Sequence, residues 1–368
     1  MKQGWEIKKL GDICTIKGRI GFRGYTRNDL VEEGEGAITL SPSNIVNDVI
    51  NFDKCQYISW YKYDESPEIQ IFEGDVIYAK TASIGKVAII KHLPEKATIN
   101  PQFVVFKDIK CNHDFLYYAV RGNGFKEQVS LIINGVAIPT ISQSNMAKLT
   151  IPVPPIAEQE KIVAELDCLS GIIEKKKQQL KELDNLAQSI FYEMFGDPVE
   201  NDKGWETKKV IDVVKLQRGY DLPIQHRQSD GGIPVWGSNG IVGWHNEAKV
   251  DYGVITGRSG TLGTVYSYDK PFFPLNTTLF SVDTHGNDIV YLKYLLNIFD
   301  LKRFGTGTGV PTLNRNVFHS EPIISVPLTL QQDFASKIEA IEKQKELIAQ
   351  SIKETETLFN SRMDYYFN

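Results

Sequence analysis

The sequence predicts an α+β protein made of two similar mixed α/β domains, each followed by a long helix, with the two helices packed as an antiparallel coiled coil. Two observations lead to this fold class. Short motifs recur in the same order in the two halves of the chain, and each half ends in a long proline-free segment with apolar residues at heptad spacing. The 368 residues leave room for two or three domains.

The internal repeat consists of three pairs of matching segments. They are residues 4–9 with 204–209 (GWEIKK with GWETKK), 74–87 with 252–265, and 138–141 with 310–313 (IPTI with VPTL). The offset between the copies falls from 200 to 178 residues between the first pair and the second. We therefore expect two copies of one domain that share their ends and differ most in the segment after the first motif.

The apolar residues of the first long segment alternate at spacings of four and three, and Lys176 is the one interruption. This pattern predicts a coiled-coil seam, because ordinary amphipathic helices do not keep a strict heptad register. The register reappears in the second segment at an offset of 172. The expected seam residues are Ile162, Leu166, Leu169, Ile173, Leu180, Leu183, Ile190, Phe334, Ile338, Ile341, Ile348, Ile352 and Phe359. The alternative is that each helix packs separately against its own globular domain.

These patterns divide the chain into a globular domain over residues 1–156, a long helix over 157–196, a second globular domain over 197–329 and a second long helix over 330–368. Apolar runs inside the globular domains predict shorter elements. Strands are expected at residues 69–72, 76–79, 87–90 and 103–106, and helices at 115–120 and 290–299.

The charge distribution limits how the chain could bind nucleic acid. The net charge is −5, of which −3 lies in residues 157–196 and −2 in residues 330–368. The rest is neutral, with 31 basic and 31 acidic side chains. Domains that bind nucleic acid on their own are usually basic. Any DNA binding must therefore come from local patches or be shared with a partner.

Several classes of protein are disfavoured by what the sequence lacks. It contains no CxxC pair and no HExxH motif, so no metal site is expected, and the four cysteines should be reduced and mostly buried. No Gly-rich loop for a methyl donor or for ATP is found, so no bound cofactor is expected. No apolar run reaches the ~18 residues that a membrane-spanning helix requires. The N-terminal residues lack the apolar core of a signal peptide. We expect a cytoplasmic protein with no membrane contact.

Basic and aromatic side chains are interleaved with glycines in both copies. This composition suits close approach to a phosphate backbone and to base edges. The candidate DNA-binding residues are Lys17, Arg19, Arg23, Arg27, Lys80 and Lys86 in the first copy, and Arg218, Tyr220, Arg227 and Arg258 in the second. For Arg258 the alternative is a structural role, since Gly257 and Gly260 indicate a tight turn that a guanidinium could brace.

One segment is similar to a catalytic motif. Residues 100–103 (NPQF) resemble the Asn-Pro-Pro-aromatic motif of DNA amino-methyltransferases, which holds the target amine of a flipped base. A methyltransferase also needs a Gly-rich strand-to-helix turn for its methyl donor, and none precedes Asn100. We therefore expect Asn100 to be a turn residue between two strands.

Taken together, the motifs resemble the specificity (S) subunit of Type I restriction-modification enzymes. The resemblance rests on GWEIKKLGDI and its echo GWETKKVIDV, on GVITGRSGTLGTV (residues 253–265), and on the junction from IPTI through IPVPP to EQEKIV (residues 138–163). A segment similar to this junction occurs at residues 326–332, where Gln331-Gln332 takes the place of Glu158-Gln159. Together these motifs cover nearly the whole chain.

The resemblance implies that each globular copy is a target recognition domain that reads one half of a split double-stranded DNA target. It implies that two modification (methyltransferase) subunits bind the helices, and that a restriction subunit supplies translocation and cleavage. The chain itself would be non-catalytic, with methyl donor, ATP and Mg²⁺ bound only by partners. The alternatives are a coiled-coil scaffold that does not bind DNA and, less favoured, an autonomous DNA amino-methyltransferase.

Overall fold

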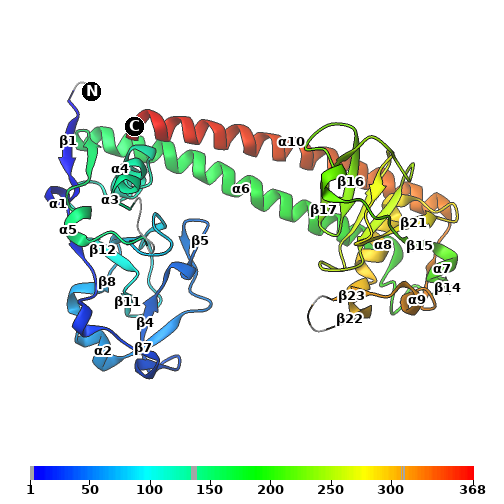
Figure 1. The fold of residues 1–368 in the computed structure, drawn as a ribbon, viewed down its shortest axis with the longest axis horizontal. Helices are drawn as coiled ribbons and strands as arrows, with labels where there is room; N and C mark the ends of the chain where they lie inside the picture. The colour runs from blue at the N-terminus through cyan, green and yellow to red at the C-terminus, as the bar shows by residue number, and fades with distance from the viewer. Residues whose placement is uncertain (1–3, 134–138, 308, 310) are drawn as a thin grey trace. The chain divides into compact units, whose positions relative to one another are not determined.

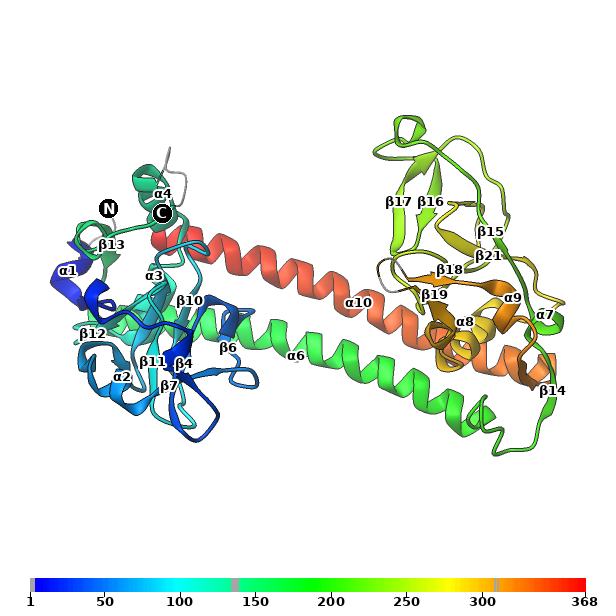
Figure 2. The ribbon, with the colours of Figure 1, turned by 60° about the horizontal axis from the view of Figure 1, so that its bottom comes forward.

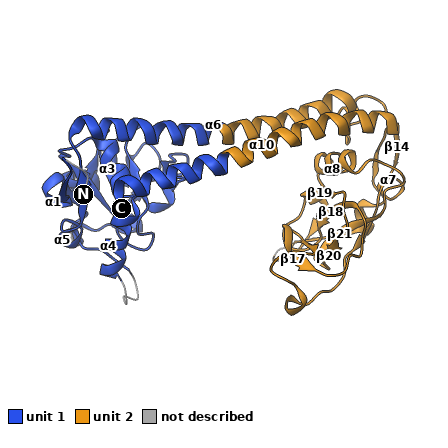
Figure 3. Ribbon diagram, turned by 90° about the horizontal axis from the view of Figure 1, so that it is seen from above, with its two compact units in different colours: residues 1–175, 352–368 blue, residues 176–351 orange. Residues whose placement is uncertain are grey.

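The computed structural model describes residues 4–133, 139–307, 309 and 311–368. The chain forms two compact units (Figure 3): unit 1 comprises residues 1–175 and 352–368, and unit 2 comprises residues 176–351. Each unit contains one globular α/β part together with a portion of both long helices (Figures 1 and 2). Helix α6 is Ile156–Phe195 and helix α10 is Leu328–Phe367.

The globular part of unit 1 is organised around an antiparallel sheet and a mixed sheet. The four-stranded sheet has the order β10-β9-β12-β2, formed by Val87–Ile89, Val76–Ala79, Phe103–Lys107 and Thr15–Lys17. The five-stranded sheet has the order β3-β7-β4-β11-β8, formed by Leu30–Val31, Gln56–Ser59, Gly36–Leu40, Ala97–Ile99 and Gln70–Ile71. Every residue of β9 is buried, as the continuous apolar run predicts.

Smaller elements complete unit 1. Strand pairs are β1 (Glu6–Lys9) with β13 (Thr150–Val153), and β5 (Ile45–Val46) with β6 (Val49–Ile50). The helices are α1 (Leu10–Ile13), α2 (Trp60–Asp64), α3 (His113–Ala119), α4 (Asn123–Ile133) and α5 (Gln143–Met146). The expected strands of this copy and its helix at 115–120 are present, while α4 and the strands of the five-stranded sheet outside residues 69–72 were not predicted.

Unit 2 contains a four-stranded sheet of the same strand order, β19-β18-β21-β15, formed by Val265–Tyr268, Gly253–Gly257, Thr278–Asp283 and Lys215–Arg218. A three-stranded sheet β17-β16-β20 (Gly240–His245, Ile233–Gly237, Phe273–Pro274) stands where unit 1 has five strands. The remaining elements are β14 (Glu206–Lys209), β22 (Gly305–Thr306), β23 (Thr312–Leu313), β24 (Pro322–Ser325), α7 (Val210–Val213), α8 (Ile289–Ile298) and α9 (Arg315–Phe318).

The internal repeat is visible in individual backbone hydrogen bonds. The Ile141 amide donates to Lys80 O at 3.0 Å, and the Leu313 amide donates to Arg258 O at 2.8 Å. The copies diverge in the segment after the first motif, where the second sheets differ, as the shrinking offset predicts. Ile138 and Val310 of the third motif pair lie outside the described residues.

The two long helices pair in antiparallel orientation, which confirms the predicted fold class. Within unit 1, Arg362 of α10 forms a bidentate ion pair with Glu165 of α6, at 2.5 and 2.9 Å. Within unit 2, Lys345 Nζ lies 2.7 Å from Asp184 Oδ1. Every predicted seam residue is buried or half-buried. The interruption at Lys176 is accommodated by a hydrogen bond from its ammonium group to the Ser351 hydroxyl.

Each globular part packs against both helices, so the alternative in which each helix packs only on its own domain is wrong. In unit 1, Leu166 of α6 and Phe367 of α10 share the core with Phe115. In unit 2, Phe191 of α6 and Phe334 of α10 have ring centroids 5.6 Å apart and share a second core. The helices are therefore part of the globular cores as well as partners of each other.

A buried glutamine ties the start of each long helix to its globular part. Gln159 Nε2 donates to Pro154 O, and its Oε1 accepts from the Asn112 amide at 2.8 Å. Gln331 repeats this pattern with Val326 O and the Asp288 amide at 2.9 Å. The expected pairing of Glu158-Gln159 with Gln331-Gln332 is thus wrong by one residue, because the buried Gln159 and Gln331 are the equivalent positions.

The cysteines differ in environment. Cys14 and Cys111 are buried, and burial raises the pKa of each thiol to about 12. Cys55 is half-buried, and Cys168 is exposed on α6, contrary to the expectation of mostly buried thiols. In the part of the chain that the structure describes, no helix has the length and apolar character needed to cross a membrane.

Leu166→Ala should reduce the free energy of unfolding by about 2–5 kcal/mol, because Leu166 is fully buried between helix and core and its loss leaves a cavity. Leu347→Ala is the matched control on the partner helix, since Leu347 is 72% exposed and its truncation should change stability by less than about 0.5 kcal/mol. Urea denaturation of the full chain followed by circular dichroism measures both. Equal losses in the two variants would contradict the packing described.

Candidate nucleic-acid interface

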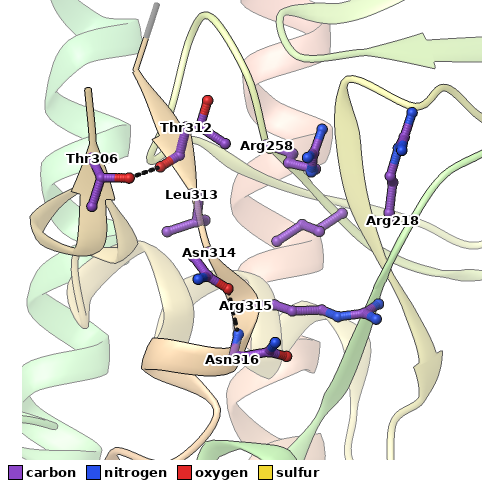
Figure 4. A pocket seen from close by; sticks show the side chains of 9 residues that line it. Arg218, Arg258, Thr306, Thr312, Leu313, Asn314, Arg315 and Asn316 are labelled. Atoms are coloured by element: carbon purple, nitrogen blue, oxygen red, sulfur yellow. Dashed lines mark hydrogen bonds between the residues drawn. The ribbon is translucent and has the colours of Figure 1, made fainter. Parts of the chain in front are cut away.

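Three arginines of unit 2 line one pocket of about 420 Å³ (Figure 4). Arg218 is the last residue of β15, Arg258 follows β18 directly, and Arg315 is the first residue of α9. The pocket is lined by Arg218, Arg258, Leu279, Thr306, Thr312, Leu313, Asn314, Arg315 and Asn316. Three segments that are far apart in the sequence thus each contribute an arginine to the lining of one pocket.

Backbone pairing places each arginine. Arg218 pairs with Leu279 across β15 and β21, so it belongs to the central sheet. The Arg258 amide donates to Thr277 O at 2.8 Å, while Arg258 O accepts from Leu313. The Asn314 side chain caps α9 by accepting from the Asn316 amide at 3.1 Å, which sets the position of Arg315 between them. The backbone at the three positions is therefore held in place, and the three arginine side chains line the pocket.

The turn that carries Arg258 depends on glycine. A Cβ atom on Gly257 would lie 1.8 Å from Thr261 O, and Gly260 has φ +90°, a conformation that side chains disfavour. The Arg258 side chain has a long contact to a different turn, the one between β20 and β21, with Nη1 3.5 Å from Asn276 O. The turn is therefore shaped by its glycines, and bracing by the guanidinium adds little.

The pocket has an electropositive character, because none of its nine lining residues is acidic. The carboxylate of Asp221 lies 3.7 Å from Arg218 Nη2, but both side chains are more than half exposed, so this ion pair is weak. Arg258 and Arg315 are half-buried. Cations that line the same pocket repel one another unless an anion lies between them, so a pocket lined by three arginines favours an anionic ligand.

The equivalent positions in unit 1 are much less cationic. Lys80 corresponds to Arg258, because its carbonyl oxygen accepts the equivalent backbone bond. Gln143 corresponds to Arg315, because each is the first residue of a short helix. Gly18 directly follows β2 and corresponds to Arg218 at the end of β15. Burial lowers the pKa of Lys80. A Cβ atom on Gly18 would lie 2.8 Å from the amide nitrogen of Gln143, so the Gln143 side chain occupies the space that a side chain at position 18 would need.

Three other predicted cations of unit 1 are engaged by the protein itself. Lys86 Nζ donates to Pro42 O and Ile45 O at 2.9 and 3.1 Å. Arg19 is only 6% exposed, lies 5.1 Å from the Tyr25 ring centroid, and has its pKa lowered by burial. Arg23 forms an ion pair with Glu68 at 3.4 Å. Sequence patterns did not reveal these internal partners.

The remaining candidates lie on the surface or brace a turn. Lys17 is exposed on β2, and Arg27 is exposed in the short 3₁₀ helix Arg27–Asp29. Arg227 donates to Leu222 O through Nε and Nη2, at 3.3 and 2.8 Å. Tyr220 is 38% exposed, and its ring packs edge-on against Phe273. All ten candidates remain predictions as DNA-binding residues.

Sequence analysis missed Arg315. The signal was available in the repeat itself, because Arg315 follows the VPTL motif by two residues and stands opposite Gln143 at the offset of 172. Arg315 lies in a short helix that is preceded by a β-strand rather than by a Gly-rich loop. A pattern of basic residues next to glycines therefore does not include Arg315.

Asn100 is a turn residue, as expected. It lies between β11 and β12, its Oδ1 accepts from the Gln102 amide at 3.0 Å, and its Nδ2 donates to Gln102 Oε1 at 3.1 Å. These bonds occupy the side-chain amide within the turn. Among the described residues, no group of three or more His, Cys, Asp or Glu side chains is arranged to hold a metal ion.

Comparison with known proteins identifies the family. The model of the Type I restriction modification DNA specificity domain matches residues 2–185 and 202–357, so the chain belongs to this family. It is 28% identical over 240 residues to the Type I restriction enzyme MjaIX specificity subunit of Methanocaldococcus jannaschii, covering 60% of this chain and 54% of the relative. It is 19% identical over 215 residues to the EcoKI specificity subunit of Escherichia coli, covering 54% and 43%.

A solved structure shares the fold. The crystal structure of the Type I restriction-modification S subunit from M. genitalium matches with a TM-score of 0.60 and 14% identity, covering 99% of this chain and 96% of that one. The sequence matches to the curated relatives are shorter, and in them the chain spans about half of the relative's length. The structural likeness therefore supports the architecture over the full chain.

His319, four residues after Arg315, gives a pH-dependent prediction. Its Nε2 accepts from the Leu216 amide at 3.2 Å, and burial, followed by the nearby Arg315 and Lys215, lowers its pKa below 6.5. The unfolded chain therefore takes up this proton at a higher pH than the folded chain. The free energy of unfolding should fall as the pH decreases below about 6.5, and His319→Gln should lose less stability than wild type between about pH 7 and pH 5.

The measurement is urea denaturation at a series of pH values. His226→Gln is the matched control, because His226 is exposed and its side chain is not part of the buried sheet. The control should follow the wild-type pH dependence. A His319→Gln variant that does the same would show that His319 does not resist protonation in the folded state.

Proposed function

We propose that this chain is the DNA sequence-specificity subunit of a Type I restriction-modification complex. Residues 1–156 and 197–329 act as two target recognition domains, each reading one half of a bipartite target in double-stranded DNA. Residues 157–196 and 330–368 act as spacer and as the docking surface for two modification subunits. The complex works in the cytoplasm, and a restriction subunit supplies cleavage.

The observation that carries this proposal is the duplicated framework around the cationic positions. In both copies a buried strand ends in a turn whose first residue is basic, Lys80 or Arg258, and the carbonyl oxygen of that residue accepts from the amide of an equivalent later residue, Ile141 or Leu313. The same family model matches both copies. A framework that is duplicated while its side chains diverge suits two readers of two different short sequences.

Catalysis is assigned to the partners. The Asn100 amide is bonded within its own turn, and the candidate residues of the chain are cations on turns and strand ends, which contact DNA rather than carry out chemistry. The globular halves are formally neutral, so this chain supplies only part of the electrostatic attraction to DNA. The modification subunits supply the remaining positive charge.

The complex should methylate a target with two unlike halves separated by unspecified bases, on the order of one helical turn (~34 Å) from centre to centre. Replacing residues 197–329 with the equivalent domain of another family member should change one half of the target and leave the other half unchanged. Methylome sequencing of a host that carries the altered system reads both halves at once. A change in both halves, or in neither, would refute the assignment of one reader per domain.

A gel-shift assay with and without co-purified modification subunits separates this function from its alternatives. We expect tight sequence-specific binding only in the complex. A chain that forms the complex but never binds DNA would be a scaffold. A chain that methylates DNA alone would be an autonomous methyltransferase, and either result would overturn the proposal.

A further inference from the structure

We infer that the pocket of Arg218, Arg258 and Arg315 is a phosphate site that holds one phosphodiester of the DNA backbone, and that unit 2 alone is built for it. This inference rests on the proposed function, because it assigns a role to one part of the recognition surface. Nothing in the resemblance or in the comparisons assigns these three residues to a common ligand.

The geometry of the pocket favours a compact anion over a base edge. Arginines from three separate segments line one pocket, whereas guanine is read by a single arginine that donates two parallel bonds to O6 and N7. A phosphodiester has several oxygens that accept bonds from different sides. Three arginines that line one pocket can each donate to a different phosphate oxygen. A single base edge does not offer enough acceptors for all three.

The burial of the side chains points to the same ligand. Arg258 and Arg315 are half-buried; the backbone of Arg258 is bonded to Thr277 and Leu313, and the backbone of Arg315 is held in the short helix α9. A side chain that enters a DNA groove must project from the surface, while a phosphate is the outermost part of the duplex and can enter a shallow recess. Of the three, Arg218 is the exposed one.

The first copy provides an internal comparison. Its equivalent residues are Gly18, Lys80 and Gln143, so one cation stands where unit 2 has three. The backbone bonds of Lys80 and Arg258 are equivalent in the two copies, so at this position the difference lies in the side chain. Backbone anchoring by this chain should therefore come unequally from its two domains, with unit 2 contributing the stronger share.

The test measures how salt affects DNA binding by the complex with its modification subunits. The probes are a duplex with the target sequence and a random duplex of equal length. The variant is Arg218→Gln, Arg258→Gln and Arg315→Gln combined, in which glutamine is the residue that the first copy has at position 143. Lys270→Gln is the control, because it removes one exposed charge of unit 2 outside the pocket.

We expect the triple variant to bind both duplexes more weakly by the same factor, and the slope of log K against log salt concentration to become shallower by about one. One phosphate is then lost, although three charges were removed. The control should leave the slope within error of wild type. A triple Arg→Lys variant should keep the slope, because it keeps the charges, and it guards against loss of folding in the glutamine variant.

Other outcomes would overturn the inference in distinct ways. A loss confined to the target duplex would show that the arginines read bases. A slope change of about three would show three separate phosphate contacts, and an unchanged slope would show no contact. If the unaltered complex bound neither duplex, the proposed function itself would fail, and this result is distinguishable from the others because it needs no variant.

Discussion

The apolar seam shared by α6 and α10 is the constraint on which the rest of the structure depends. Each helix has 40 residues, and neither could bury its heptad stripe alone in water. The two stripes pair in antiparallel order, in which the start of one helix lies beside the end of the other. Because both helices enter both globular cores, each domain is completed by a segment from the other half of the sequence.

The sequence was sufficient to predict the repeat, the long helices and the central strands, because these features follow from local periodicity. A heptad register and a repeated motif can be counted directly in the sequence. In the five-stranded sheet of unit 1, the strand Leu30–Val31 was missed because it is only two residues long and carries no measurable alternation. The one-residue error at Gln159 arose because two adjacent glutamines in the echo gave two equally good alignments, and only the buried hydrogen bonds distinguish them.

The candidate site was predictable only in part. Arg218 and Arg258 were found by their glycine-rich surroundings, and the structure brings them into one pocket. Arg315 was missed because its partners come from distant segments. Lys86 and Arg19 look equally suitable in the sequence, yet backbone carbonyls or an aromatic ring engage their charges. Whether a basic side chain points outward depends on tertiary contacts that no short motif encodes.

The two copies show which parts of a recognition domain are free to change. Backbone bonds at the strand ends, the buried glutamine and the seam are retained in both, since altering any of them would disturb a core that two helices share. The three arginines that line the pocket are not members of that core, so substitution at their positions costs little stability. Arginine, glycine, lysine and glutamine therefore interchange at equivalent positions while the fold persists, and the same freedom allows two domains of one chain to differ in what they bind.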